Sequence, residues 1–98
     1  MLSVELKGKQ IRLGIKAIIT IEKKFGKAIS QIDMENLSFE DVAFILYAGS
    51  NEPQKDFTDF IDELDKLCTV SEAMEAVTKA VNLSFTGKEK PEIDEKNG

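Results

Sequence analysis

Residues 2–27 combine the alternating pattern of a β-hairpin with an amphipathic helix, and this opening limits the fold more than any other feature of the chain. A two-residue turn on Lys7-Gly8 would pair Val4 with Ile11. One face of the hairpin would then carry Leu2, Val4, Leu6, Ile11 and Leu13, with Leu2 opposite Leu13. The other face would carry Ser3, Glu5, Gln10 and Arg12. A three-residue loop would instead pair Leu6 with Gln10 and mix the two faces. Because an isolated hairpin is marginally stable in water, helices must cover its apolar face.

The hairpin is followed by two helical segments. Residues 15–25 carry apolar side chains at near-helical spacing, namely Ile15, Ile18, Ile19, Ile21 and Phe25. Gly26 stands where a left-handed C-cap belongs. The pattern allows a short helical turn at residues 28–34. Ser38 then opens the next helix as an N-cap. Residues 39–48 are almost continuously apolar, which is typical of a helix at the centre of a core or in an interface. We expect Gly49-Ser50-Asn51 to stop this helix.

Two further helices follow Pro53. The third has a clear apolar stripe, formed by Phe57, Phe60, Ile61, Leu64, Leu67 and Cys68. Its opposite, solvated face carries Asp59, Asp62, Glu63 and Asp65. Ser71 is the expected cap of a fourth helix that ends at about Phe85. Its stripe comprises Ala73, Met74, Val77, Ala80 and Val81. The small side chains of that stripe favour either close helix packing or a shallow groove for a partner helix.

The whole pattern predicts an α+β domain, in which an N-terminal β-hairpin and about four α-helices pack together over residues 1–85. Residues 86–98 contain only Ile93 as a large apolar residue, so we expect a disordered charged tail there. No apolar run is long enough to span a bilayer, which excludes a membrane partner. With Cys68 as the sole cysteine and no signal peptide before the hairpin, we expect a reducing cytoplasm. Cys68 itself is expected to pack as a small apolar residue.

Charge is unevenly distributed along the chain. Residues 1–29 carry a net charge of +5, whereas residues 30–98 carry −10. These two parts could attract each other in a head-to-tail homo-oligomer. The alternative is that the charges form solvated faces that keep the chain in solution.

Groups that could perform chemistry are scarce. The chain has no His and one Cys, so the commonest general base and the usual zinc ligands are missing. The acids of the third helix lie on an outward face, and no glycine-rich phosphate loop occurs. We therefore expect no enzymatic activity, catalytic residue, metal site or cofactor. A pI near 4.7 also argues against nucleic-acid binding, although the hairpin and first helix are basic.

Several stretches resemble the tail assembly chaperones of long-tailed bacteriophages and prophages of Gram-positive bacteria. They are VELKGKQIRL at 4–13, IEKKFGK at 21–27, LSFEDV at 37–42, LYAG at 46–49 and FTDFID at 57–62. The resemblance extends over residues 2–85, and it depends on the order of these stretches rather than on any single one. The motifs are structural, so the family transfers no active site to this chain.

The resemblance implies a chaperone that acts in the host bacterial cytoplasm. It would bind the long tape measure protein and keep it soluble until the tail tube assembles. In this family a frameshift often appends a second domain that recruits the tail tube protein, and this chain would be the short form. An apolar acceptor for the tape measure protein would lie on the second to fourth helices. The expected contact residues are Phe39, Tyr47, Phe60, Leu64, Met74, Val77, Val81 and Phe85. The same stripes could simply be core.

Two other functions fit the sequence. The first is a small acidic adaptor or regulatory protein of a mobile element, which would bind one folded partner through its acidic helices. The second is an inhibitor that mimics nucleic acid with its Asp and Glu side chains. The flanking genes would distinguish these hypotheses. A chaperone gene should lie between a tube-protein gene and a very long reading frame that encodes a coiled-coil-rich protein.

Overall fold

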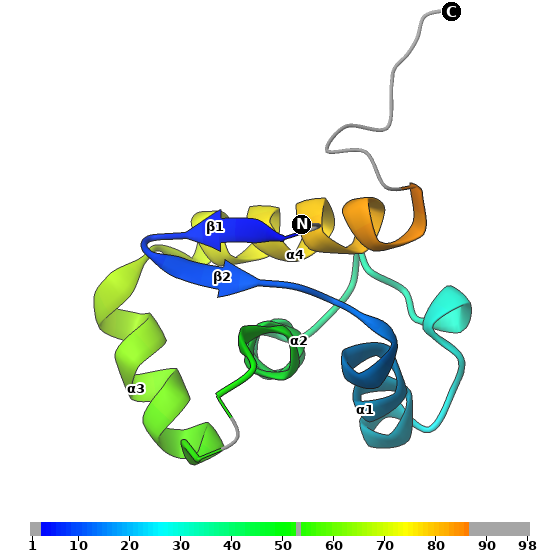
Figure 1. Ribbon diagram of the computed structural model, residues 1–98, viewed down its shortest axis with the longest axis horizontal. Coiled ribbons are helices and arrows are strands. Elements are labelled where there is room, and N and C mark those ends of the chain that lie inside the picture. The colour runs from blue at the N-terminus through cyan, green and yellow to red at the C-terminus, as the bar shows by residue number, and fades with distance from the viewer. Residues whose placement is uncertain (1–2, 53, 87–98) are drawn as a thin grey trace, which may run out of the picture.

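The computed structural model describes residues 3–52 and 54–86. Its elements are the strands β1 (Val4–Leu6) and β2 (Lys9–Ile11), and the helices α1 (Ile15–Phe25), α2 (Phe39–Ser50), α3 (Phe57–Leu67) and α4 (Val70–Thr86). A 3₁₀ turn, η1 (Ile29–Gln31), lies between α1 and α2. The predicted α+β domain, with a hairpin followed by four helices, is therefore confirmed (Figure 1).

The hairpin has the predicted register, with Val4 opposite Ile11 and an antiparallel pairing of the two strands. Lys7 and Gly8 both have positive φ, at 52° and 91°, as a type I′ turn requires. This turn matches the right-handed twist of the flanking strands, which offsets the cost of placing a lysine in the left-handed region. On the solvent face, the Ser3 hydroxyl donates a hydrogen bond to Gln10 Oε1 at 2.8 Å. Leu2, the expected partner of Leu13, lies outside the described residues.

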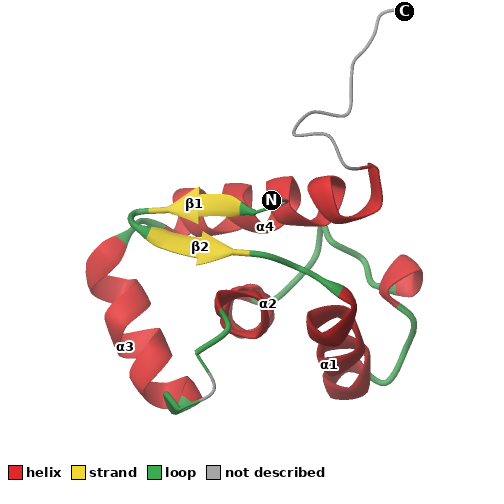
Figure 2. Ribbon diagram, viewed as in Figure 1, coloured by secondary structure: helices red, strands yellow, loops and turns green. Residues whose placement is uncertain are grey.

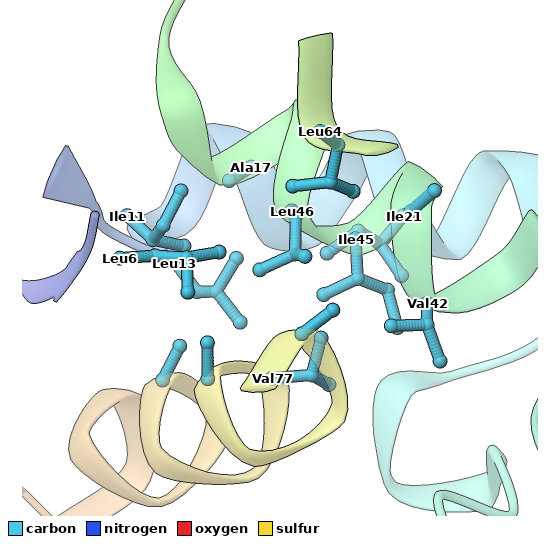
Figure 3. Packing of buried hydrophobic residues seen from close by; sticks show 14 of the residues in the cluster. Leu6, Ile11, Leu13, Ala17, Ile21, Val42, Ile45, Leu46, Leu64 and Val77 are labelled. Carbon is cyan, nitrogen blue, oxygen red and sulfur yellow. The ribbon is translucent and has the colours of Figure 1, made fainter. Parts of the chain in front are cut away.

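Helix α2 lies at the centre of the molecule. It packs against α1, α3, α4 and β2, and in Figure 2 it is seen end-on, between α1 and α3 and below the hairpin. Ile45 and Leu46 of α2 are fully buried. Figure 3 shows these residues meeting the apolar face of the hairpin and Val77 of α4. The continuous apolar run of α2 is thus explained by a position that has protein on several sides.

Two of the predicted helix ends and one predicted short turn are confirmed. The Asp41 N–H donates to Ser38 Oγ at 3.1 Å, so Ser38 caps α2. Gly26 ends α1 in the left-handed region with φ of 72°, and its N–H donates to the Glu22 carbonyl at 2.8 Å. The short turn expected within residues 28–34 is η1.

The predicted stop of α2 at Gly49-Ser50-Asn51 is confirmed, and the capping residue is the last of the three. Gly49 is a buried residue inside the helix, and Asn51 ends it with φ of 59°. A Cβ atom on Gly49 would lie 2.9 Å from both Ile11 Cγ2 and Leu13 Cδ2. The Gly49 carbonyl also accepts a 2.8 Å hydrogen bond from the Arg12 N–H. Glycine is therefore needed here for the close approach of α2 to the chain that leaves β2.

The prediction that Ser71 caps α4 was wrong. The Glu72 N–H donates to Thr69 Oγ1 at 3.2 Å, and the Thr69 N–H donates to Glu72 Oε1 at 2.9 Å. This reciprocal pair is a capping box, and it starts the helix at Val70. The buried stripe of α4 is accordingly Ala73, Ala76, Val77, Ala80 and Leu83, whereas Met74 is 43% exposed. Helix α4 extends to Thr86, one residue beyond the expected end, and the rest of the predicted tail lies outside the described residues.

The lysines of the hairpin pair with acids of the same chain. Lys9 Nζ lies 2.8 Å from Glu52 Oε2 and 3.0 Å from Glu63 Oε1, and Lys55 pairs with the same two carboxylates. Lys7 Nζ lies 3.2 Å from Glu72 Oε2. Glu63 therefore belongs to an ion-pair cluster between β2 and α3 rather than to the solvated face, on which Asp59, Asp62 and Asp65 are exposed as predicted. Some of the positive charge of residues 1–29 is therefore neutralised by ion pairs with acids of the later part of the same chain.

Cys68 packs partly buried against the core, as expected. Its thiol donates to the Leu64 carbonyl at 3.8 Å. Burial, followed by the charge of Glu72, raises the pKa of the Cys68 thiol. The thiolate, which is the reactive form, is therefore disfavoured at neutral pH. Within the described part of the chain, no helix combines the length and hydropathy needed to cross a bilayer.

Candidate protein-binding groove

Six large apolar side chains in residues 3–52 and 54–86 are exposed, and three of them line the same groove. Ile15 is 82% exposed, Ile19 47% and Phe85 59%. The groove has a volume of about 340 Å³ and lies between the start of α1 and the end of α4. Those two helix ends lie at the same end of the molecule in Figure 1. Leu13, Ile18 and Ser84 complete the lining together with Arg12 and Gly14.

The apolar surface of α1 at the groove arises because its isoleucines are spread over more than the one helix face that packs against the core. Ala17 and Ile21 point into the core. At about 100° per residue, Ile15 and Ile19 lie roughly 160–200° around the helix from Ala17. They therefore face away from the core. Near-helical spacing predicts the helix, but it does not show which part of a wide apolar arc meets the protein interior.

A hydrogen bond joins the two walls of the groove. The Ser84 hydroxyl of α4 donates to the Leu13 carbonyl in the link between β2 and α1. The Ile18 N–H donates to the Gly14 carbonyl at 2.9 Å and begins α1 directly after that link. The Ser84–Leu13 bond therefore ties the end of α4 to the link, and the Ile18–Gly14 bond fixes the start of α1 on that link.

The groove is lined by one charged residue, Arg12, and a lysine, Lys16, follows its lining residue Ile15 in sequence. The Arg12 guanidinium folds over Gly14, so that a Cβ atom at position 14 would lie 2.6 Å from Arg12 Nη1. Lys16 is exposed in the first turn of α1, which contains no acidic residue. Arg12 also lines a second, larger hollow of about 740 Å³ between α1 and the end of α2. The lining of this second hollow includes Lys16, Tyr47 and Glu52.

The residues that the sequence analysis assigned to partner contact are dispersed. Phe39, Met74 and Phe85 are exposed, but only Phe85 lines this groove. Tyr47 and Val81 are half-buried. Phe60, Leu64 and Val77 are enclosed in the core with at most 3% of their surface exposed. In this conformation those three side chains contact other parts of their own chain, because the amphipathic faces of α3 and α4 are used for internal packing.

Sequence reasoning missed Ile15 and Ile19 as surface residues. The available signal was the excess of large apolar residues in α1, which has four isoleucines and one phenylalanine in eleven positions. Within the described residues, no group of three or more His, Cys, Asp or Glu side chains is arranged to hold a metal ion. Comparison with protein-family models, curated protein sequences and solved structures found no match for this chain.

Proposed function

We propose that this protein is a phage tail assembly chaperone, which binds the tape measure protein and keeps it soluble in the host bacterial cytoplasm while the tail tube assembles. The order of sequence stretches shared with that family supports the proposal. The structural observation that carries it is the open apolar groove in which Ile15, Ile19 and Phe85 are exposed together. Clustered exposed apolar side chains are typical of protein-binding surfaces.

The energetics of such a groove suit a chaperone. Fully burying a large apolar side chain contributes about 1.5–3 kcal/mol, and all three exposed residues begin partly covered. Association costs an estimated 4–15 kcal/mol, so a single small groove leaves only a modest net free energy of binding. Each contact would therefore be weak and reversible. Weak contacts repeated along a long helical client would protect it and still allow its release when the tube forms.

Co-expression with the cognate tape measure protein tests this proposal. We expect the tape measure protein to move from the insoluble fraction into a complex that co-purifies with this chain. An unrelated coiled-coil protein of similar length serves as the control and should remain insoluble. If the tape measure protein stays insoluble in the presence of this chain, the proposal is wrong. A longer frameshifted product should additionally retain the tail tube protein.

A second candidate is an acidic adaptor that binds one folded partner. The observation that favours it is the exposed row formed by Asp59, Asp62 and Asp65 on α3. Replacing the three aspartates by asparagine separates the two functions. If the protein is an adaptor, the variant should no longer co-purify with its folded partner. If it is a chaperone, the variant should still solubilise the tape measure protein.

A further inference from the structure

We infer that the groove between α1 and α4 accepts an amphipathic helix whose apolar stripe is flanked by acidic side chains. This inference rests on the proposed function and specifies which segments of the client would be bound. It is carried by two independent properties of the groove, namely the arrangement of its apolar residues and the charge beside it.

The apolar residues have the spacing of a helix-binding site. Ile15 and Ile19 are four residues apart and therefore lie one turn above each other on α1. Phe85 comes from α4 and forms the facing wall. A helix laid between these walls would present its own residues at i, i+3, i+4 and i+7, which is the usual mode of helix-in-groove recognition.

The charge beside the groove determines which side chains are favoured on either side of the apolar stripe of the bound helix. Lys7, Lys9, Lys55 and Lys79 each pair with a glutamate of this chain. No such ion pair involves Arg12, Lys16 or Lys23 anywhere in residues 3–52 and 54–86. Lys16 and Lys23 lie roughly 80–100° around α1 from Ile15, so they border the isoleucine row on its outer side. These cations are available to a partner.

The acid of α1 is outnumbered by these cations. Glu22 is the only acidic residue in the helix, and its carboxylate accepts a 2.9 Å hydrogen bond from the Ile29 N–H. The positive end of the α1 dipole lies beside the groove, next to Arg12. Arg12, Lys16 and Lys23 outnumber Glu22, so the net charge beside the groove is positive and favours acidic flanks over basic ones.

A second copy of the chain offers a poorer occupant. Its exposed pair Val70 and Met74 also has helical spacing and lies near Glu72 and Glu75. The Glu72 carboxylate is already held by Lys7 and by the Thr69 N–H. Glu75 lies 3.6 Å from Lys79 of its own helix. The acids that could face these cations are thus partly neutralised within the chain.

Two designed peptides of about 18 residues, or five helical turns, test the inference. Both carry leucine at i, i+3, i+4 and i+7; one is flanked by glutamate and the other by lysine. Binding of the labelled peptides to the whole protein is measured by fluorescence anisotropy. We expect the acidic peptide to bind about tenfold more tightly than the basic peptide at low salt. Two or three exposed charge pairs with the protein are attractive for the acidic peptide and repulsive for the basic one. The preference should shrink as salt is added.

Variants locate the binding site. Ile15→Ser with Ile19→Ser should abolish binding of the acidic peptide, and Lys16→Glu with Lys23→Glu should reverse the preference between the peptides. Val70→Ser with Met74→Ser is the matched control, since it removes an exposed pair with the same spacing and should leave binding unchanged. All substituted side chains are exposed, and circular dichroism melting of each variant verifies folding.

The inference is wrong if the two peptides bind equally well, or if the Ile15 and Ile19 variant binds like the wild type. It is also wrong if neither peptide binds and sedimentation shows a dimer that the same variant dissociates, because a second copy then fills the groove. Solubilisation of the tape measure protein without binding of the acidic peptide would refute only this inference. Binding of the acidic peptide without solubilisation would refute only the proposed function.

Discussion

Gly49→Ala tests whether the close approach of α2 to the β2–α1 link limits the stability of the domain. The new Cβ atom would lie 2.9 Å from Ile11 Cγ2 and from Leu13 Cδ2. Ile11 is fully buried and Leu13 is 4% exposed, so neither can move aside into solvent. Overpacking a core in this way costs about 1–3 kcal/mol. Alanine regains about 1 kcal/mol of helix propensity. We expect a net loss of about 1 kcal/mol.

Urea and thermal unfolding followed by circular dichroism measure this effect. For a domain of this size, a loss of about 1 kcal/mol lowers Tm by roughly 4–8 °C. A double-mutant cycle with Leu13→Val identifies the cause, since removing a methyl group from the clash should make the two substitutions less costly together than their sum. If Gly49→Ala instead raises stability by about the propensity increment, the close contact is not limiting and the reasoning fails.

The capping box and the ion-pair cluster lead to two further predictions. Thr69→Ala should lower the unfolding free energy by about 1 kcal/mol, whereas Ser71→Ala should change it by less than about 0.5 kcal/mol; equal effects in thermal unfolding would contradict the assignment of Thr69 as the cap. The hydrogen bond from Lys9, partly opposed by burial, lowers the pKa of Glu52 in the folded state. This contribution to stability is therefore present above the unfolded pKa of about 4.3 and is lost as pH falls below it. Glu52→Gln should therefore weaken the dependence of the unfolding free energy on pH in the acid range, compared with wild type and with the control Asp59→Asn. An unchanged pH dependence would show that the ionised Glu52 does not stabilise the fold.

Local patterns in the sequence were sufficient for the hairpin and for the existence of the helices. The alternation over residues 4–13 determined the register because a slip of one residue would move every apolar side chain to solvent. Ser38 and Gly26 marked helix ends because their capping interactions involve only neighbouring backbone groups. Such interactions depend on residues a few positions apart, and they can be read without knowing the rest of the fold.

Tertiary structure alone decided which apolar residues became the surface of the groove. Periodicity placed Ile15 and Ile21 in the same helix, but only the positions of α2 and the β2–α1 link determine that Ile21 is buried and Ile15 exposed. Gly49 belongs to the predicted helix stop, but its close contacts with Ile11 and Leu13 depend on the tertiary fold. Lys9 similarly meets Glu52 and Glu63 across more than 40 positions of sequence. These features arise from contacts between distant segments, and a local pattern carries no information on which segments will meet.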